Sequence, residues 1–489
     1  MSLFYTKSVK ELIASAESGE KGLHKTLSRS NLIMLGIGAI IGAGIFSITG
    51  TAAADHAGPA IVLSFVVSGI ACVFAGLCYA EMASMIPVAG SAYTFAYATI
   101  GEFFAWIIGW DLILEYLFSA SAVAASWSGY AQNILKDMGI VLPKQITQVP
   151  FLHTDAGWVT TGAYFNFPAM LILGLLTVIL SIGIKESARF NNALVITKVI
   201  VIVTFIVFGI GYINLDNWTP FIPENTGVSG EYGWSGIMSA SALVFFAYIG
   251  FDSVSTAAQE AKNPQKDMAA GILGSLAICT VLYIMFSLVL TGVTHYSTFG
   301  KENELARLAP VAFAVDQMGD SMNFLKYMIK LGAMAGLTSA TLLMLLGQPR
   351  IFYSMSKDGL LPPIFASIHS KFKTPYFSTI LTGVVAMLVA GVVPKDVLET
   401  LVSIGTLFAF IIVCAGVMYL RYHKPDEVRP FRVPYVYVIG TLGILTCFGQ
   451  MLFLNLEVWV RLGIWLAIGL VIYFVYGQAS AARKRAEGL

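Results

Sequence analysis

The chain has 489 residues, of which 57% are hydrophobic and only 12% are charged. Soluble domains contain about 45–50% apolar and about 25% charged residues, so a soluble globule of this length could not bury so much apolar surface. The same hydrophobicity excludes an intrinsically disordered protein, and the net charge of +1 lacks the basic footprint of a nucleic-acid-binding protein. These exclusions leave a protein embedded in a lipid bilayer, with no nucleic-acid partner.

The apolar residues form long continuous runs, which predict membrane-spanning helices rather than the short alternating strands of a barrel. A helix crosses the bilayer core with about 20 residues, and about twelve runs of suitable length follow one another along the chain. They centre on residues 32–56, 60–86, 103–130, 166–184, 191–213, 236–258, 269–293, 326–352, 376–393, 397–420, 436–455 and 458–478. The predicted fold class is an all-α polytopic membrane protein.

The distribution of Lys and Arg predicts the orientation of these spans. With the N-terminus in the cytoplasm, the cytoplasmic segments carry 20 of the 29 Lys and Arg residues and the outer segments carry eight. The polar first 30 residues lack the early apolar core of a cleavable signal peptide. We therefore expect a multi-pass protein of the plasma membrane with both termini in the cytoplasm.

Two spans contain glycine close to the membrane midplane. The first span reads GAGIF at 42–46, and the sixth reads FFAYIGFD at 245–252 with Gly250 near its middle. Each glycine weakens a helix by about 1 kcal/mol relative to alanine. Paired interruptions at matching places are typical of secondary transporters built from an inverted repeat. Close helix packing through small residues is the alternative explanation.

Each interrupted span would begin a group of five, and an odd number of spans gives the two groups opposite orientations in the membrane. The predicted organisation is a cytoplasmic tail (1–30), a first repeat (31–213), a second repeat (236–420), two further spans (435–478) and a second cytoplasmic tail (479–489).

An interrupted helix exposes polar backbone groups in the middle of the bilayer. Free N–H groups at the start of a half-helix bind a carboxylate, and free carbonyl groups at the end of a half-helix bind an ammonium group. A zwitterionic amino acid carries both groups close together. The sequence therefore predicts a central site for an amino acid between the first and sixth spans.

Charged residues inside apolar runs indicate a functional or structural role, because inserting each one into a membrane costs about 2.5–3.5 kcal/mol. Glu115 lies near the middle of the third span, with Asp111 one helical turn earlier on the same face. We expect this pair to bind and release a proton, although a polar contact with a neighbouring helix would also explain it. Lys198 lies deep in the fifth span and is a second candidate for proton exchange, with snorkelling to the cytoplasmic face as the alternative. Asp252 follows the break in the sixth span and fits either a gate or a structural role.

Several chemistries have no motif in the sequence. There is no GxxxxGK[ST], HExxH, GxSxG or CxxC, which argues against an ATP-driven pump of the P-loop kind and against an enzyme. The five cysteines lie in apolar runs and predict neither a metal site nor disulfides. Residues 310–319 could form a short outer helix over the site.

Longer motifs resemble the cationic amino acid transporter family of the amino acid–polyamine–organocation superfamily, in its bacterial twelve-span form. In addition to GAGIF, the motifs are PVAGSAY (87–93), IKESARFNN (184–192), FFAYIGFDSVSTAAQEAKNPQKD (245–267), QPRIFYSMSKDGLLP (348–362) and RPFRVP (429–434). The resemblance extends from about residue 30 to 478. It implies alternating access around broken spans 1 and 6, without catalytic residues.

The resemblance also implies roles for individual residues. The substrate carboxylate would meet backbone N–H groups near Gly42, Ala43, Gly44 and Ile45, and the ammonium group would meet carbonyls near Ile40, Phe246, Ala247 and Ile249. Glu115 would border the pocket for the substrate side chain. From their place in the broken sixth span, independently of the resemblance, we also expect Tyr248 and Phe251 at the site, with Phe246 and Asp252 as possible gate residues.

The coupling ion follows from the same resemblance. Sodium-coupled relatives bind Na⁺ between spans 1 and 8, where Thr338 and Ser339 are available here. Lys198 resembles the lysine that occupies this position in proton-coupled relatives, and its ammonium group would repel Na⁺. We therefore expect Lys198 and Glu115 to couple transport to H⁺, with neither Na⁺ nor a cofactor.

The predicted function is proton-coupled symport of L-amino acids, cationic or small and neutral. A pH-insensitive exchanger or facilitator of basic amino acids is the alternative, and a sensor or membrane-embedded enzyme would need domains or residue sets that the sequence lacks. The sequence leaves open the choice of substrate and the need for an accessory membrane subunit.

Overall fold

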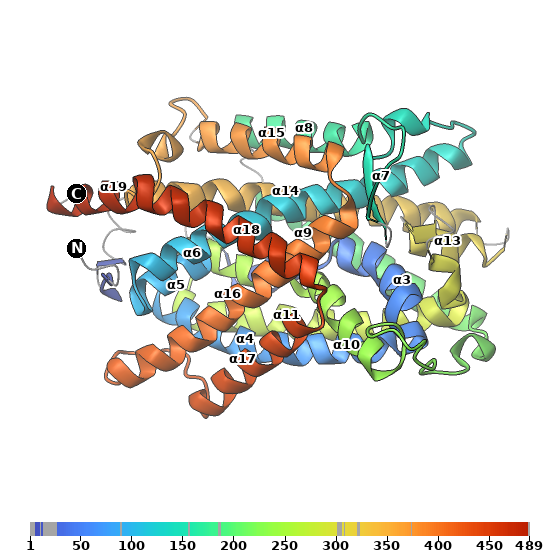
Figure 1. Ribbon diagram of the computed structural model, residues 1–489, viewed down its shortest axis with the longest axis horizontal. Coiled ribbons are helices and arrows are strands. Elements are labelled where there is room, and N and C mark those ends of the chain that lie inside the picture. The colour runs from blue at the N-terminus through green and yellow to red at the C-terminus, as the bar shows by residue number, and fades with distance from the viewer. Residues whose placement is uncertain are drawn as a thin grey trace.

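The computed structural model describes residues 5–9, 11–12, 27–88, 90–154, 157–183, 187–300, 306–307, 309–319, 323–372 and 374–487. Long helices run roughly along the longest axis of the molecule (Figure 1). Helix α13 and a β-hairpin lie at one end of the bundle, here called the hairpin end (Figure 1). Helix α19 and the N-terminal residues lie at the other, here called the terminal end (Figure 1).

The long helices are α2 (Arg29–Ile40), α4 (Ile61–Met85), α6 (Glu102–Ile113), α7 (Ser119–Asp137), α8 (Phe167–Ile182), α9 (Ser187–Gly209), α10 (Gly233–Val244), α11 (Pro264–Val293), α14 (Asn323–Lys357), α15 (Tyr376–Val392), α16 (Lys395–His423), α17 (Val436–Leu452) and α18 (Leu456–Ile472). The shorter elements are α3 (Thr49–Ala52), α5 (Ser91–Thr99), α13 (Pro310–Asp316), α19 (Gln478–Ala486) and the strands β1 (Phe151–Thr154) and β2 (Gly157–Thr160).

Eight helical stretches of the described chain are long and apolar enough to cross a membrane, and three shorter apolar helices accompany them. One stretch, Arg29–Met85, contains two of the predicted spans. Residues that follow one another along α2 lie against residues in the same order along α11, so these two helices run in the same direction. Residues of α4 lie against α11 in the opposite order. The chain therefore turns back between α2 and α4, near Gly58. The helices therefore account for all twelve predicted spans and confirm the all-α polytopic fold class.

Some elements differ from the predicted boundaries. Helix α5 lies in a stretch that we predicted to be an inner loop. Its nine residues are too few to cross a membrane, so no span was predicted there. The hairpin pairs Phe151 with Thr160 and Thr154 with Gly157, inside a long stretch for which no element was predicted. Helix α19 continues the last span to Ala486, into the predicted tail.

Both predicted helix breaks are present. Helix α2 ends at Ile40, Ile41 is extended, and a π-helical segment covers Gly44–Ile48. Helix α10 ends at Val244, and 3₁₀ segments cover Phe245–Tyr248 and Phe251–Glu260 on the two sides of Gly250. Gly250 has φ +115°, a conformation that side chains disfavour, so the break in the sixth span depends on glycine.

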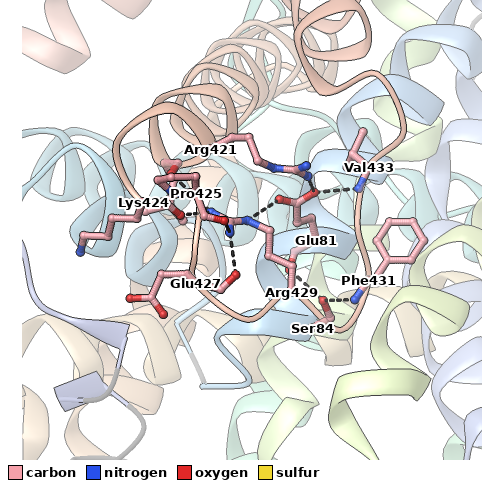
Figure 2. A network of polar contacts seen from close by, with 10 residues as sticks. Glu81, Ser84, Arg421, Lys424, Pro425, Glu427, Arg429, Phe431 and Val433 are labelled. Atoms are coloured by element: carbon pink, nitrogen blue, oxygen red, sulfur yellow. Dashed lines mark hydrogen bonds and ion pairs between the residues drawn. The ribbon is translucent and has the colours of Figure 1, made fainter.

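The RPFRVP motif fastens the connection between α16 and α17 to the end of α4. Figure 2 shows the guanidinium groups of Arg421 and Arg429 and the backbone N–H of Val433 meeting the buried carboxylate of Glu81. Arg429 also donates to the backbone carbonyl of Leu420 in the last turn of α16 and to those of Lys424, Pro425 and Glu427, which follow the helix. A buried carboxylate with two guanidinium partners holds α4, α16 and this loop together at the terminal end.

Both ends of the chain meet at a second polar cluster, here called the terminal clasp (Lys7, Glu102, Asp358, Tyr473 and Arg485). Lys7 pairs with Asp358 at the end of α14, and Arg485 of α19 pairs with buried Glu102 of α6. The hydroxyl of Tyr473 donates to the same Glu102, at 3.1 Å. The clasp therefore ties segments from the start, middle and end of the chain to one another.

Candidate binding site at the two helix breaks

The two interrupted spans approach each other without side chains between them. A Cβ atom at Gly44 would lie 2.2 Å from the Cα of Ala247, and one at Gly250 would lie 2.8 Å from the carbonyl oxygen of Ala39. Any side chain at these glycines would collide with backbone atoms of the other span. The glycines therefore bring the polar backbone of both breaks to one place.

A narrow cavity, with about 10 Å³ of space for a water molecule, lies beside the breaks. Its lining comes from the interrupted spans, α7 and α14, and consists of Ala39, Ile40, Gly42, Ala43, Gly44, Ser119, Val123, Phe246, Ile249, Ala340 and Met344. Six predicted binding residues are in this set, namely Ile40, Gly42, Ala43, Gly44, Phe246 and Ile249. The lining contains no charged side chain, and the Ser119 hydroxyl is its only polar side-chain group.

Five lining residues were not predicted. Ala39 precedes the first break, and Val123, Ala340 and Met344 are ordinary apolar residues of helices. Ser119 follows Glu115 by one helical turn, and this spacing is the one feature of the sequence that could have pointed to it as a site residue. Its hydroxyl is buried and has no hydrogen-bond partner among the described residues.

The other predicted binding residues lie outside the cavity lining. The hydroxyl of Tyr248 donates to the carbonyl of Phe65 at 2.8 Å, on the side of α4. The Phe251 ring packs against the rings of Tyr79 and Phe410, with centroids 5.7 and 5.0 Å away. Ile45 is fully buried directly after the first break.

Tyr283 of α11 contacts two of the carbonyl groups that were assigned to the substrate ammonium group. Its hydroxyl lies 3.0 Å from the carbonyl oxygen of Ile40 and 2.9 Å from that of Ala247. One hydroxyl therefore bridges the two broken spans. No motif or charge in the sequence points to Tyr283, which lies inside an apolar run.

Three buried carboxyl groups, those of Asp111, Glu115 and Asp252, lie close to one another. Glu115 lies in a π-helical segment between α6 and α7 and accepts a hydrogen bond from Thr406 at 3.3 Å. The carboxyl of Asp252 lies within hydrogen-bonding reach of Glu115, and Asp111 lies close by. Tyr116 also donates to Asp252, at 3.3 Å. In the described part of the chain, none of the ion pairs involves these three residues.

Lys198 is fully buried and points at the first break. Its ammonium group donates to the carbonyl oxygens of Gly38 and Ile41, at 2.7 and 2.8 Å. Lys198 therefore holds the freed end of α2 and does not snorkel to the surface. Its side chain also packs against Gly336 of α14.

The two hydroxyl residues proposed for a Na⁺ site have different surroundings. Thr338 donates to the carbonyl of Met334 and accepts from the indole N–H of Trp127, at 2.8 and 3.0 Å. Ser339 is buried, and within the described ranges its hydroxyl has no hydrogen-bond partner.

The chain is similar in sequence to known transport proteins. A family model described as amino acid permease matches residues 27–476. The chain is 47% identical over 477 residues to the branched-chain amino acid permease BcaP of Bacillus subtilis (strain 168), covering 98% of each chain. It is 44% identical over 477 residues, with the same coverage, to the methylthioribose transporter of that organism. It is also 36% identical over 433 residues to the vacuolar cationic amino acid transporter 4 of Arabidopsis thaliana, covering 87% of this chain and 68% of the relative.

Proposed function

Because the chain belongs to the amino acid permease family, we propose that it carries neutral, apolar L-amino acids across the plasma membrane by proton-coupled symport. The family is one of transporters, and its relatives include the cationic amino acid transporters that the sequence motifs resemble. Neutral substrates and H⁺ are the parts of this proposal that go beyond membership of the family.

The apolar lining of the cavity is the observation that carries the choice of substrate. A cationic side chain inside it would find no carboxylate, because Glu115 is not in the lining and lies against Asp252 and Thr406. An unpaired charge in such a site is costly, whereas an aliphatic side chain gains from burial against Val123 and Met344. One relative, the B. subtilis protein named branched-chain amino acid permease, has a name that fits substrates with such aliphatic side chains.

The backbone of the two breaks supports recognition of the amino acid itself. The segment that begins at Gly44 starts a new helical turn, and N–H groups at such a start have no partner within the helix. They can bind a carboxylate. Phe246 and Ile249 border the same cavity, and we propose that their carbonyl groups accept hydrogen bonds from the ammonium group.

Two features support H⁺ as the coupling ion. Glu115 and Asp252 face each other in a dry site, and two carboxyl groups in contact are stable when they share one proton. Lys198 places its ammonium group against the first break, where it would repel a sodium ion. We therefore propose that H⁺ is the coupling ion and that Na⁺ has no role.

The test is uptake of labelled L-leucine by liposomes that contain the purified protein. We expect accumulation when the outside is acidic, little effect of a Na⁺ gradient, and competition by unlabelled leucine but not by arginine. Methylthioribose is a third competitor, because one relative is named for its transport. Strong competition by arginine, or counterflow without pH-driven accumulation, would instead select an exchanger of basic amino acids.

A further inference from the structure

Helix α16 carries a line of polar residues on its buried face, here called the α16 stripe (Lys395, Glu399, Ser403 and Thr406). The spacing of four, four and three residues places all of them on one side of the helix. All four side chains are buried, with between 0% and 8% of their surface exposed. The stripe begins at the hairpin end of the bundle and ends at Glu115.

We propose that the α16 stripe conducts protons from the hairpin end, the predicted outer face, to the Glu115–Asp252 pair. At 1.5 Å per residue the stripe covers about 16 Å, roughly half of the hydrocarbon thickness of a bilayer. It therefore has the length needed to join the surface to the membrane midplane. This proposal rests on the proposed proton coupling and names the path by which the proton reaches the site.

Two polar atoms of the stripe lack the hydrogen-bond partners that a purely structural role would give them. Glu399 Oε1 and Ser403 Oγ are buried and make no hydrogen bond among the described residues, although Glu399 Oε1 lies 3.7 Å from the ammonium nitrogen of Lys395. Buried polar groups are normally satisfied by protein or by water. Water molecules between successive residues would satisfy these atoms and complete a chain of hydrogen bonds.

Charged groups surround the entrance of the stripe. Lys395 donates to the hydroxyl of Ser47 in the first span, at 2.6 Å, beside Glu399. Arg307 bridges Asp55 and Asp396 at 2.8 and 3.4 Å, and both Arg307 and Asp396 also face Glu399. Glu399 is thus the buried carboxylate nearest the hairpin end of the stripe, where it can accept a proton from the outer solution.

The transfer conserves protons and breaks no bond other than O–H bonds. Glu399 takes up a proton and passes it to the Ser403 hydroxyl through water, and each hydroxyl gives its own proton onward as it accepts one. Thr406 delivers the proton to the Glu115 carboxylate, with which it already forms a hydrogen bond. Glu115 and Asp252 then hold the proton between them, while Tyr116 and Ser91 donate to Asp252. Lys198 lies on α9 and is not part of this line.

The experiment compares two transport modes of the full-length protein in liposomes, with variants Glu399→Gln and Thr406→Val. We expect each variant to lower pH-driven leucine uptake by about tenfold or more, because the proton path is interrupted. Leucine counterflow without a pH gradient should stay within about twofold of wild type, because the stripe does not line the cavity. Thr400→Val is the matched control on the same helix, since Thr400 donates to its own helix at Asp396 and lies off the stripe.

Glu399→Asp, which keeps a carboxyl group, should restore most of the pH-driven uptake. Unchanged pH-driven uptake in Glu399→Gln would overturn the proposal, and so would an equal loss of both transport modes in Glu399→Gln and Glu399→Asp. If the wild-type protein itself shows no pH-driven uptake, the proposed proton coupling fails rather than the path alone.

Discussion

At the scale of single residues, the site depends on the absence of large side chains at its glycine and alanine positions. Gly44 and Gly250 let two backbone segments touch, and Ala340 leaves room for the cavity beside Gly42. The polar groups at the proposed site are therefore mainly backbone atoms, and the side chains around them are mainly apolar.

The first prediction concerns Gly44. Gly44→Ala should abolish leucine transport and lower the free energy of unfolding by about 1–3 kcal/mol, because its Cβ would overlap Ala247. Gly449→Ala in α17 is the control, since no atom lies within 4 Å of its new Cβ. Transport assays and thermal unfolding in detergent measure both effects, and near-normal uptake by Gly44→Ala would contradict the close contact.

The second prediction concerns the wall of the cavity. Ala340→Val adds two methyl groups beside Gly42 and should reduce uptake of leucine more strongly than uptake of alanine. One added methylene in a tight pocket discriminates by about 1–3 kcal/mol, which corresponds to a change in the uptake ratio of roughly tenfold or more. Equal losses for the two amino acids would mean that Ala340 does not face the substrate.

At the scale of elements, the broken spans need partners for the backbone groups that the breaks release. The last carbonyl groups of a helix have no partner in the helix, and α2 ends inside the membrane. Lys198 donates hydrogen bonds to the carbonyl oxygens of Gly38 and Ile41. The hydroxyl of Tyr283 donates to the carbonyl oxygen of Ile40. The first break is thus fixed by neighbouring helices α9 and α11.

The third prediction follows from these contacts. Lys198→Met should abolish pH-driven leucine uptake, because it removes the ammonium group that we propose excludes Na⁺ and leaves two buried carbonyl groups at the first break unpaired. Lys144→Met is the control, since Lys144 is exposed at the hairpin end. Uptake driven by H⁺ and by Na⁺ gradients is measured for both, and full H⁺-driven uptake by Lys198→Met would contradict the role of this residue.

The sequence predicted the helices and their breaks better than it predicted the contacts between helices. Glycines in apolar runs and the isolated charges Lys198 and Glu115 are local signals, and the breaks appear where those glycines lie. The pairing of Glu115 with Asp252 joins residues far apart in the chain, so it depends on helix packing that no local pattern encodes. Phe251 was assigned to the site because of its place in a motif, but its ring packs against other aromatic rings.

At the scale of the whole molecule, polar clusters at the two ends hold the helices together around the central cavity. Glu81 and its arginine partners join α4 to α16 at the terminal end (Figure 2). At the hairpin end, Lys330 is buried between Asp137 and Asp316, which joins α7, α13 and α14. Alternating access requires such contacts to open in turn.

The fourth prediction tests the cluster around Glu81. Glu81→Ala leaves Arg421 and Arg429 without their carboxylate and should destabilise the protein by about 3–5 kcal/mol, the usual effect of breaking a buried ion pair. Glu427→Ala is the control, because the Glu427 side chain takes no part in the Glu81 contacts. Thermal unfolding in detergent measures the difference, and equal stability of the two variants would show that the cluster contributes little.

The terminal clasp has a practical consequence for anyone who attaches a tag or fluorescent protein to this chain. Lys7 and Arg485 lie close to the two ends of the sequence, yet their cationic groups pair with Asp358, just after α14, and with Glu102 of α6. A bulky fusion without a flexible spacer would pull on α14 and α6 through these ion pairs. Measured turnover would then describe the fusion and not the carrier, and reporters are better inserted at the exposed turn around Gly227.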